Sequence, residues 1–320
     1  AGDRGAAAMI ACGAARYALA RGDRAEAAEL WPLVEWCLEY CRRQLTPDGV
    51  VASDTDELEG RFPTGDANLC TSTLYYDALL SAVSLGRELG VESAQTARYA
   101  AQARALARAI DAHFGGEVGG YDTYRYYAGN TLLRSWICMP LIVGLKERSE
   151  GTVRALLGPE LMTDDGLLTQ QGSSTFWDRS TLYALRGIYN VGQADRATEL
   201  LHRYSQRRLL GDHVPYPIEA WPEGSQRHLS AESGLYCRII TEGLFGIRPT
   251  GLRSFDLTPS MPAAWESMSL RHIRAFGSDF DITVARVADG RLRITVARPG
   301  AKPKIYRAAP GATIRVKLTD

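Results

Sequence analysis

Apolar residues recur every three to four positions through the first 250 residues, and polar loops of unequal length interrupt this pattern. The spacing predicts helices over residues 5–21, 24–45, 69–90, 92–114, 131–147, 151–158, 174–192, 194–209 and 229–246. The odd-numbered helices of this series carry small and apolar residues on most faces, which is typical of buried helices. The even-numbered helices each have a charged face, so the pattern predicts pairs of inner and outer helices.

The loops between these helices fall into two classes. Each inner helix leads to its outer partner through a very short turn, such as "RGD" at 21–23 or "LGV" at 89–91. Each outer helix returns to the next inner helix through a long loop rich in glycine, aromatic residues and carboxylates. All the long loops therefore meet at the N-terminal ends of the inner helices, a face that we call the mouth. Loops gathered on one face of a rigid scaffold commonly carry function.

The pattern changes to period two from about residue 251. The segment "HIRAFGSDFDITVARVADGRLRITVARPG", at 272–300, alternates apolar and polar residues and is punctuated by turn residues. It predicts a small antiparallel β domain over residues 251–320, following a helical domain over residues 1–250. Its loops show no evident chemistry, so we expect a structural partner of the helices, with carbohydrate binding as the alternative.

Composition narrows the possible partners. Lysine and arginine together number 37, as do aspartate and glutamate, and balanced charge argues against nucleic acid or an acidic membrane surface as a partner. No apolar run approaches the length of a membrane span. The chain shows neither a starting methionine nor a signal peptide, which leaves export open.

Six cysteines, at 12, 37, 41, 70, 138 and 237, lie on predicted apolar helix faces without a CxxC pair. We expect buried reduced thiols, which slightly favour the cytoplasm over an exported location. No set of ligands with metal-binding spacing accompanies them. We therefore expect neither a metal nor an organic cofactor.

The alternation of inner and outer helices, followed by a β domain, resembles the six-hairpin (α/α)6-barrel glycosidases. The phrase "RIITEGLFGIRPTGLRSFDLTPSMP", at 238–262, resembles the passage from the last inner helix to the β domain in the rhamnosidase-like and phosphorylase-like members. The resemblance implies a mainly α protein whose helix pairs form a toroid. Only five inner helices are predicted where that fold needs six. We therefore expect an N-terminal hairpin to be missing, or the barrel to be completed by a second copy of the chain or a partner segment.

The acidic stretch "SDTDELEGRFPTGDANL", at 53–69, lies in the loop before the third inner helix if the helix at 229–246 is the sixth. In the glucoamylase-like and trehalase-like enzymes that this chain resembles, this loop carries the general acid. A glucoamylase-like spacing from Asp54 and a trehalase-like spacing to Arg61 both select Glu57. The resemblance therefore implies Glu57 as the general acid, with Glu59 and Asp56 as further candidates.

The chemistry of a glycosidic acid explains why carboxylates would gather here. Such an acid must stay protonated near neutral pH, so its pKa must be raised by burial or by neighbouring negative charge, which Asp54 and Asp56 could supply. Arg61 would bind sugar hydroxyls or another carboxylate. The alternative interpretation is an exposed acidic turn, capped at Asp66 or Asn68 before the next helix. Calcium is disfavoured because the stretch lacks the glycine and terminal glutamate of an EF-hand loop.

The loop before the last inner helix, residues 211–233, offers the partner carboxylate. Glucoamylases carry their general base ten residues before a Leu-Ser-Ala sequence, and Glu219 lies ten residues before that sequence at 229–231. The resemblance implies Glu219 as the general base, with Glu223 second. Glu232 falls in the first helical turn, where it can simply stabilise the start of the helix. We expect His228 to form hydrogen bonds rather than to bind metal.

Sugars are bound by stacking on aromatic rings and by polar groups that fix their hydroxyls. The long loops supply such side chains at the expected mouth: Tyr121, Asp122, Arg125, Tyr127, Trp177, Asp178, Tyr216 and Trp221. Each of them could equally be ordinary packing.

These observations predict an exo-acting glycoside hydrolase that inverts the anomeric configuration of a carbohydrate substrate. Inversion requires the two catalytic carboxyl groups to lie about 6.5–9.5 Å apart. One alternative is an inverting phosphorylase, in which phosphate replaces the base. The other is a glycan-binding or assembly module without turnover.

Overall fold

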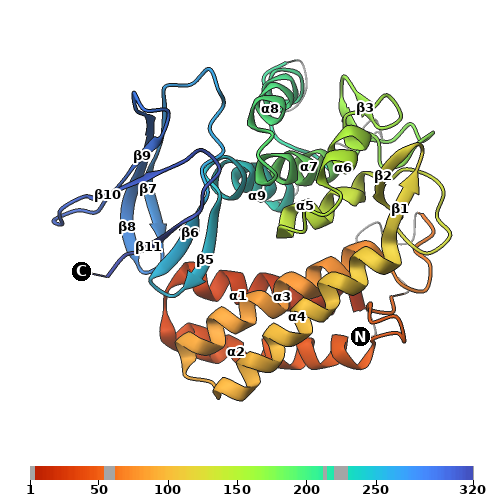
Figure 1. Ribbon diagram of the computed structural model, residues 1–320, viewed down its shortest axis with the longest axis horizontal. Helices are drawn as coiled ribbons and strands as arrows, with labels where there is room; N and C mark the ends of the chain where they lie inside the picture. The colour runs from red at the N-terminus through yellow and green to blue at the C-terminus, as the bar shows by residue number, and fades with distance from the viewer. Residues whose placement is uncertain (1–3, 54–61, 212–214, 220–229, 320) are drawn as a thin grey trace.

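The computed structural model describes residues 4–53, 62–211, 215–219 and 230–319 (Figure 1). Eight predicted site residues lie outside this range: Asp54, Asp56, Glu57, Glu59, Arg61, Trp221, Glu223 and His228. Within the described part of the chain, no helix has the length and apolar character needed to cross a bilayer.

The helical part is built from inner and outer helices in alternation, as the pattern predicts. The inner ones are α1 (Arg4–Arg21), α3 (Leu69–Leu89), a 3-10 turn η1 (Ser135–Cys138) that continues into α5 (Met139–Val143), α7 (Asp178–Asn190), and α9 (Ser230–Arg238), which continues as the π-helix η2 (Ile239–Leu244). The outer ones are α2 (Arg24–Arg43), α4 (Ser93–Phe114), α6 (Ser149–Leu156) and α8 (Ala194–Arg208). Two short hairpins lie within the long loops, β1 (Gly115–Val118) with β2 (Tyr121–Tyr124) and β3 (Met162–Thr163) with β4 (Gly166–Leu167).

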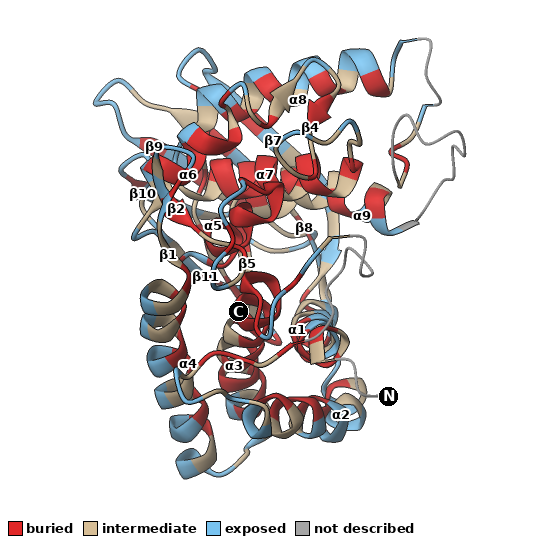
Figure 2. Cartoon of the chain, turned by 90° about the vertical axis from the view of Figure 1, so that its right-hand side faces the viewer, coloured by how far each residue is buried: buried red, intermediate tan, exposed pale blue. Residues whose placement is uncertain are grey.

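Burial separates the two kinds of helix. In α3, fifteen of 21 residues are buried, whereas in α4 only six of 22 are. Figure 2 shows the exposed positions of α4 and α8 on their outer sides and the buried positions facing the inner helices. The small and apolar sequence of an inner helix therefore reflects contact with neighbours on most of its faces.

The short turns at one end of the ring have well-defined caps. Asp23 accepts hydrogen bonds from the N–H groups of Ala25 and Glu26 at the start of α2, at 2.8 and 3.1 Å. Gly90 ends α3 in the left-handed conformation, with φ of 80°. At the opposite end of the ring, Asn68, one of the two expected caps, caps the start of α3 by accepting a 2.8 Å hydrogen bond from the N–H of Thr71.

The helix predicted over 131–147 exists but is too long at both ends. Residues 131–134 are not helical, and the helical segment runs only from 135 to 143. Arg134 instead pairs with Gln170 in an isolated antiparallel bridge, and the N–H of Ser135 donates to the carbonyl of Thr169 at 3.2 Å. Pairing with a distant loop has therefore overridden the local helical pattern. The same reason shortens α7, since Phe176 pairs with Leu168 just before the helix begins.

The β part contains two antiparallel sheets. Strands β7 (Ser267–Ala275), β8 (Ser278–Arg286), β9 (Leu292–Ala297) and β10 (Lys304–Ala308) form one, and β5 (Ile247–Gly251), β6 (Ser254–Leu257) and β11 (Ile314–Lys317) form the other. Strand β5 begins four residues before the predicted start at 251. Phe255 of β6 stacks on Phe276 and Phe280, with ring centroids 4.9 and 5.5 Å apart. These rings join the two sheets into a small sandwich.

The β part docks on the turn between α1 and α2. The N–H of Phe276 donates to the carbonyl of Ala20 at 2.5 Å, and the N–H of Gly277 donates to that of Arg21 at 3.2 Å. Gly22 has a φ of 73°, and a Cβ there would lie 2.3 Å from the nitrogen of Gly277. Only glycine fits this close approach of two backbones.

Candidate functional site

The long loops return from the outer helices to the N-terminal ends of the inner helices, as expected of the mouth (Figure 1). Isolated bridges tie neighbouring loops together, Asn68 with Tyr127 and Arg134 with Gln170, and a third bridge, Leu168 with Phe176, lies within the loop before α7. The described part of the mouth is therefore cross-linked by backbone pairing. This cross-linking gives a rigid base to the side chains around it.

Asp178 holds the last loop against the first turn of α7. Its Oδ2 accepts a 2.7 Å hydrogen bond from the backbone N–H of Ile218. Its Oδ1 lies 3.0 Å from Nη2 of Arg208, and both side chains are only 2% exposed. Arg208 in turn donates to the carbonyl of Asp165 at 2.9 Å. Burial, followed by the charge of Asp178, raises the pKa of nearby Tyr204 well above its usual value, so that phenol stays neutral.

This anchor also fixes the predicted base, because Glu219 directly follows Ile218. Ile218 is fully buried, whereas Glu219 is half-buried. Among the described residues, no hydrogen-bond or ion-pair partner is found for the Glu219 carboxylate. A carboxylate on an anchored segment can be held in position to accept a proton from water. Tyr216, another predicted residue, is half-buried in the same short segment.

A second buried ion pair joins the N-terminal ends of α7 and α9. Nε of Arg179 donates to Oε1 of Glu232 at 2.9 Å, and Glu232 is fully buried. The guanidinium of Arg179 also lies 5.5 Å from the ring centroid of Trp177. The other oxygen of Glu232 has no hydrogen-bond partner among the described residues. Glu232 therefore joins the two helix ends through Oε1, and its Oε2 can accept a further hydrogen bond.

Several predicted sugar ligands are engaged in contacts within the protein. Tyr121 donates to Oε2 of Glu160 at 3.2 Å, Asp122 forms an ion pair with Arg148, and Arg125 donates to the carbonyl of Gly115 at 3.1 Å. Trp177 is 1% exposed, and Asp178 carries the two contacts described above. In this structure Trp177 therefore packs in the core rather than offering a stacking face. Asp178 supports the last loop, and the sugar-binding role predicted for each of these residues stays a prediction.

Arg134 is a residue at the mouth that the sequence interpretation missed. It is 1% exposed, and its Nε donates to Oε1 of Gln170 at 3.0 Å. Its guanidinium lies over the rings of Tyr126, Tyr127 and Phe62, with centroid distances of 4.9, 5.5 and 5.4 Å. These cation–π contacts fix the aromatic residues of two loops. The available signal was a lone arginine inside the apolar run 131–143.

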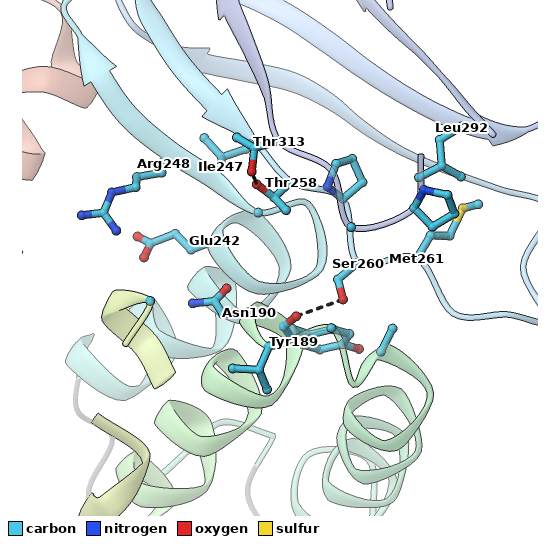
Figure 3. A pocket seen from close by; sticks show the side chains of 18 of the residues that line it. Tyr189, Asn190, Glu242, Ile247, Arg248, Thr258, Ser260, Met261, Leu292 and Thr313 are labelled. Atoms are coloured by element: carbon cyan, nitrogen blue, oxygen red, sulfur yellow. Dashed lines mark hydrogen bonds between the residues drawn. The ribbon is translucent and has the colours of Figure 1, made fainter. Parts of the chain in front are cut away.

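A cavity of about 590 Å3 lies elsewhere, at the C-terminal ends of the inner helices and against the β part (Figure 3). Tyr189, Asn190, Glu242, Arg248 and Ser260 are among its lining residues. Its described lining contains none of the residues predicted to act on or bind a sugar. We therefore place the candidate active site at the mouth, where the described predicted residues such as Asp178, Tyr216 and Glu219 lie, and treat this cavity as separate.

The described residues contain no group of three or more His, Cys, Asp or Glu side chains arranged to hold a metal ion. All six cysteines are free thiols, and five are buried. The prediction of burial is wrong for Cys237, which is exposed on α9.

Comparison of the whole chain with protein-family models gave no match, and neither did comparison with curated proteins. The structure, however, is similar to solved glycosidases. A sialidase matches with a TM-score of 0.67 and 14% identity over 95% of this chain and 32% of that protein. The GH78 rhamnosidase of Bacillus sp. GL1 matches with a TM-score of 0.59 and 16% identity, over 92% and 31%. The α-L-rhamnosidase of Streptomyces avermitilis, complexed with L-rhamnose, matches with a TM-score of 0.52 and 14% identity, over 94% and 32%.

The chain spans about a third of the length of each of these proteins. At 14–16% identity the likeness is one of fold, and it places the chain in no specific family. The alternating helix pairs and the C-terminal sandwich give this chain an (α/α)6-type glycosidase fold, of which five inner helices lie among the described residues, as the sequence predicts.

Proposed function

We propose that this chain carries the catalytic centre of an exo-acting, inverting glycoside hydrolase at the mouth of the inner-helix ring. Glu219 acts as the general base and Glu57 as the general acid. The carbohydrate substrate enters between the long loops.

The observation that supports this most is the anchoring of Glu219. Its segment is tied by the Ile218–Asp178 hydrogen bond to a buried ion pair. Glu219 itself is half-buried, and its carboxylate has no partner among the described residues. Catalytic groups need such rigid support, because small displacements cost large factors in rate. The fold shared with solved glycosidases agrees with this proposal.

In the proposed reaction, Glu57 donates its proton to the glycosidic oxygen as the bond from the anomeric carbon to that oxygen breaks. Glu219 takes a proton from a water molecule on the opposite face of the sugar, and the water oxygen bonds to the anomeric carbon. The leaving alcohol departs neutral, and the released sugar has the inverted configuration. Glu57 ends ionised and Glu219 protonated, and exchange with solvent restores both.

The test is turnover of a panel of aryl glycosides and short oligosaccharides, with and without phosphate. Because the similar structures include enzymes named sialidase and α-L-rhamnosidase, the panel begins with aryl sialosides and aryl α-L-rhamnosides. We expect water-dependent release of a monosaccharide that Glu219→Gln lowers by about 10²–10⁴-fold. Turnover only with phosphate would favour the phosphorylase alternative, and glycan binding without turnover would favour a binding module.

Glu232 is the second candidate for the base, because one of its oxygens is buried without a partner among the described residues. Glu232→Gln also weakens the ion pair to Arg179. Measuring both activity and unfolding of the two variants therefore distinguishes the roles of Glu219 and Glu232. Loss of activity with unchanged stability identifies the base, whereas loss of both indicates the support of the helix ends.

A further inference from the structure

A second cavity, of about 290 Å3, lies inside the ring of inner helices. Residues from α1, α3, α5, α7, α9, η2 and β5 line it, so it lies between the inner helices, and its wall on α1 includes the exposed Met9 and Tyr17. Its described lining contains three guanidinium groups, those of Arg16, Arg186 and Arg238, and two carboxylates, those of Asp77 and Glu242. Such a concentration of charge inside a helical ring requires compensation.

Asp77 of α3 is fully compensated. Its Oδ2 accepts a hydrogen bond from Nη1 of Arg16 at 2.9 Å, and its Oδ1 accepts one from Nη2 of Arg248 at 2.7 Å. The thiol of Cys12 also donates to Oδ2, at 3.2 Å. Burial opposes ionisation of Asp77, but Arg16 and Arg248 outweigh it and hold its pKa well below the usual range.

Glu242 of η2 is shared among three arginines. Its Oε2 accepts hydrogen bonds from Nη2 of Arg16 at 2.8 Å and from Nη1 of Arg186 at 3.0 Å. Arg238 contacts both oxygens, with Nε at 2.7 Å from Oε1 and Nη2 at 3.0 Å from Oε2. Figure 3 shows the Glu242 carboxylate and the Arg248 guanidinium close together at the edge of the neighbouring cavity. Four guanidinium groups therefore share two carboxylates in the cluster.

Arg186 is the guanidinium group whose charge is incompletely compensated. Its side chain is 5% exposed, and its Nε has no hydrogen-bond partner among the described residues. Burial and the nearby charge of Arg238 lower its pKa to about 10, so it is still charged at neutral pH. The ring of Tyr183 covers the guanidinium at 5.4 Å. A buried guanidinium group that leaves one of its N–H donors without an acceptor destabilises the fold.

We propose that this cavity binds an oxyanion, the carboxylate or phosphate group of a ligand, against Arg186 and Arg238. An oxyanion accepts hydrogen bonds from the planar guanidinium group and supplies the negative charge that the cluster lacks. The two sources share this chemistry: a free inorganic phosphate, or a sugar that carries a carboxylate. The proposal does not depend on the proposed hydrolysis, because its test measures binding alone.

The test is the change in melting temperature of the full chain caused by sodium phosphate or sodium D-glucuronate, compared with sodium chloride at equal ionic strength. Neutral D-glucose serves as the control for sugar binding without charge. We expect one or both anions to raise the melting temperature in a saturable way, and glucose to have no such effect. A shift with phosphate identifies a free oxyanion site, and a shift confined to glucuronate identifies an acidic sugar. No shift with either anion would overturn the proposal.

Gly13 of α1 offers a matched pair of variants for locating the site. It lines the cavity, lies three residues before Arg16, and a Cβ there would have no atom within 4 Å. Gly13→Glu places a carboxylate in the cavity, whereas Gly13→Gln adds the same bulk without charge. We expect Gly13→Glu to abolish the anion effect and Gly13→Gln to leave part of it. An equal response of the two variants would contradict a charge-specific site.

Arg186→Gln and Arg238→Gln test the recognition directly. We expect each to weaken anion binding by about tenfold, the loss of one charge-assisted hydrogen bond. Arg315→Gln is the control, because Arg315 pairs with Asp256 in the β part, away from the cavity. If Arg186→Gln fails to fold, the partly exposed Arg238 still provides the test. Unchanged binding in both cavity variants would overturn the assignment.

Discussion

The backbone N–H of Ile218 donates a 2.7 Å hydrogen bond to Oδ2 of Asp178, which joins two segments 40 positions apart in the sequence. Asp178 also faces Arg208 at 3.0 Å, so the contact rests on a buried ion pair. Glu219 is the next residue along the chain. The first turn of α7 therefore positions the segment that carries the proposed base.

Asp178→Ala should destabilise the fold and reduce activity together. Removing the carboxylate leaves Arg208 buried without its charge partner, which typically costs about 3–5 kcal/mol, and it frees the segment that carries Glu219. The free energy of unfolding in urea measures the first effect. Asp279→Ala is the control, since its exposed pair with Arg274 in the β part should contribute no more than about 1 kcal/mol. Equal losses in the two variants would contradict the supporting role of Asp178.

Stability should fall in acid partly through Glu242. Burial opposes its ionisation, but Arg16, Arg186 and Arg238 lower its pKa from 4.5 to about 2. A carboxyl whose folded pKa is depressed stabilises the fold above its unfolded pKa and loses this contribution as the pH falls through the folded value. We therefore expect the melting temperature of the wild type to drop between pH 4.5 and about 2, and Glu242→Gln to show a shallower drop.

Glu39 provides a control for the acid measurement. Hydrogen bonds from Arg42 and Arg43 also lower its pKa to about 2, but its side chain is 42% exposed. Salt should therefore screen the contribution of Glu39 more strongly than that of Glu242. Identical salt and pH dependence in Glu39→Gln and Glu242→Gln would show that the buried cluster has no special effect.

Gly22→Ala should loosen the contact between the helical and β parts. The new Cβ would meet the backbone at Phe276 and Gly277, at 2.4 and 2.3 Å. Gly120→Ala is a matched control, because Gly120 also has a positive φ but has no atom within 4 Å of its Cβ position. Both variants share the conformational cost, and we expect Gly22→Ala to lose about 1–3 kcal/mol more through the clash. Denaturant unfolding of both variants measures the difference.

Thiol labelling of the native protein should modify one cysteine rapidly. Cys237 is exposed, whereas the other five are buried. Burial also raises the pKa of the Cys41 thiol to about 12, which keeps it in the unreactive protonated form. Mass spectrometry after brief treatment should find the label on Cys237, and after denaturation on all six. Rapid labelling of Cys41 in the native state would contradict the packing of α2.

The division into inner and outer helices could be predicted because it depends on local composition. A helix with small and apolar residues on most faces, such as α3, is buried on most faces, and the capping residues Asp23 and Asn68 mark where helices begin. The segment 131–147 could not be predicted, since Arg134 and Ser135 pair with residues of a distant loop. The interaction of Asp178 with Ile218, likewise, depends on the fold and leaves no local pattern. The resemblance to glucoamylases thus implied Glu219, and only the structure shows what supports its segment.

Proton NMR of the reaction mixture is the sharpest test of the roles proposed for Glu57 and Glu219. With a substrate that the wild type cleaves, the first anomer released should have the opposite configuration to the substrate. Both Glu57→Gln and Glu219→Gln should lower its release by about 10²–10⁴-fold. Release of a sugar with retained configuration, or full activity in either variant, would contradict an inverting mechanism that uses these two carboxyl groups.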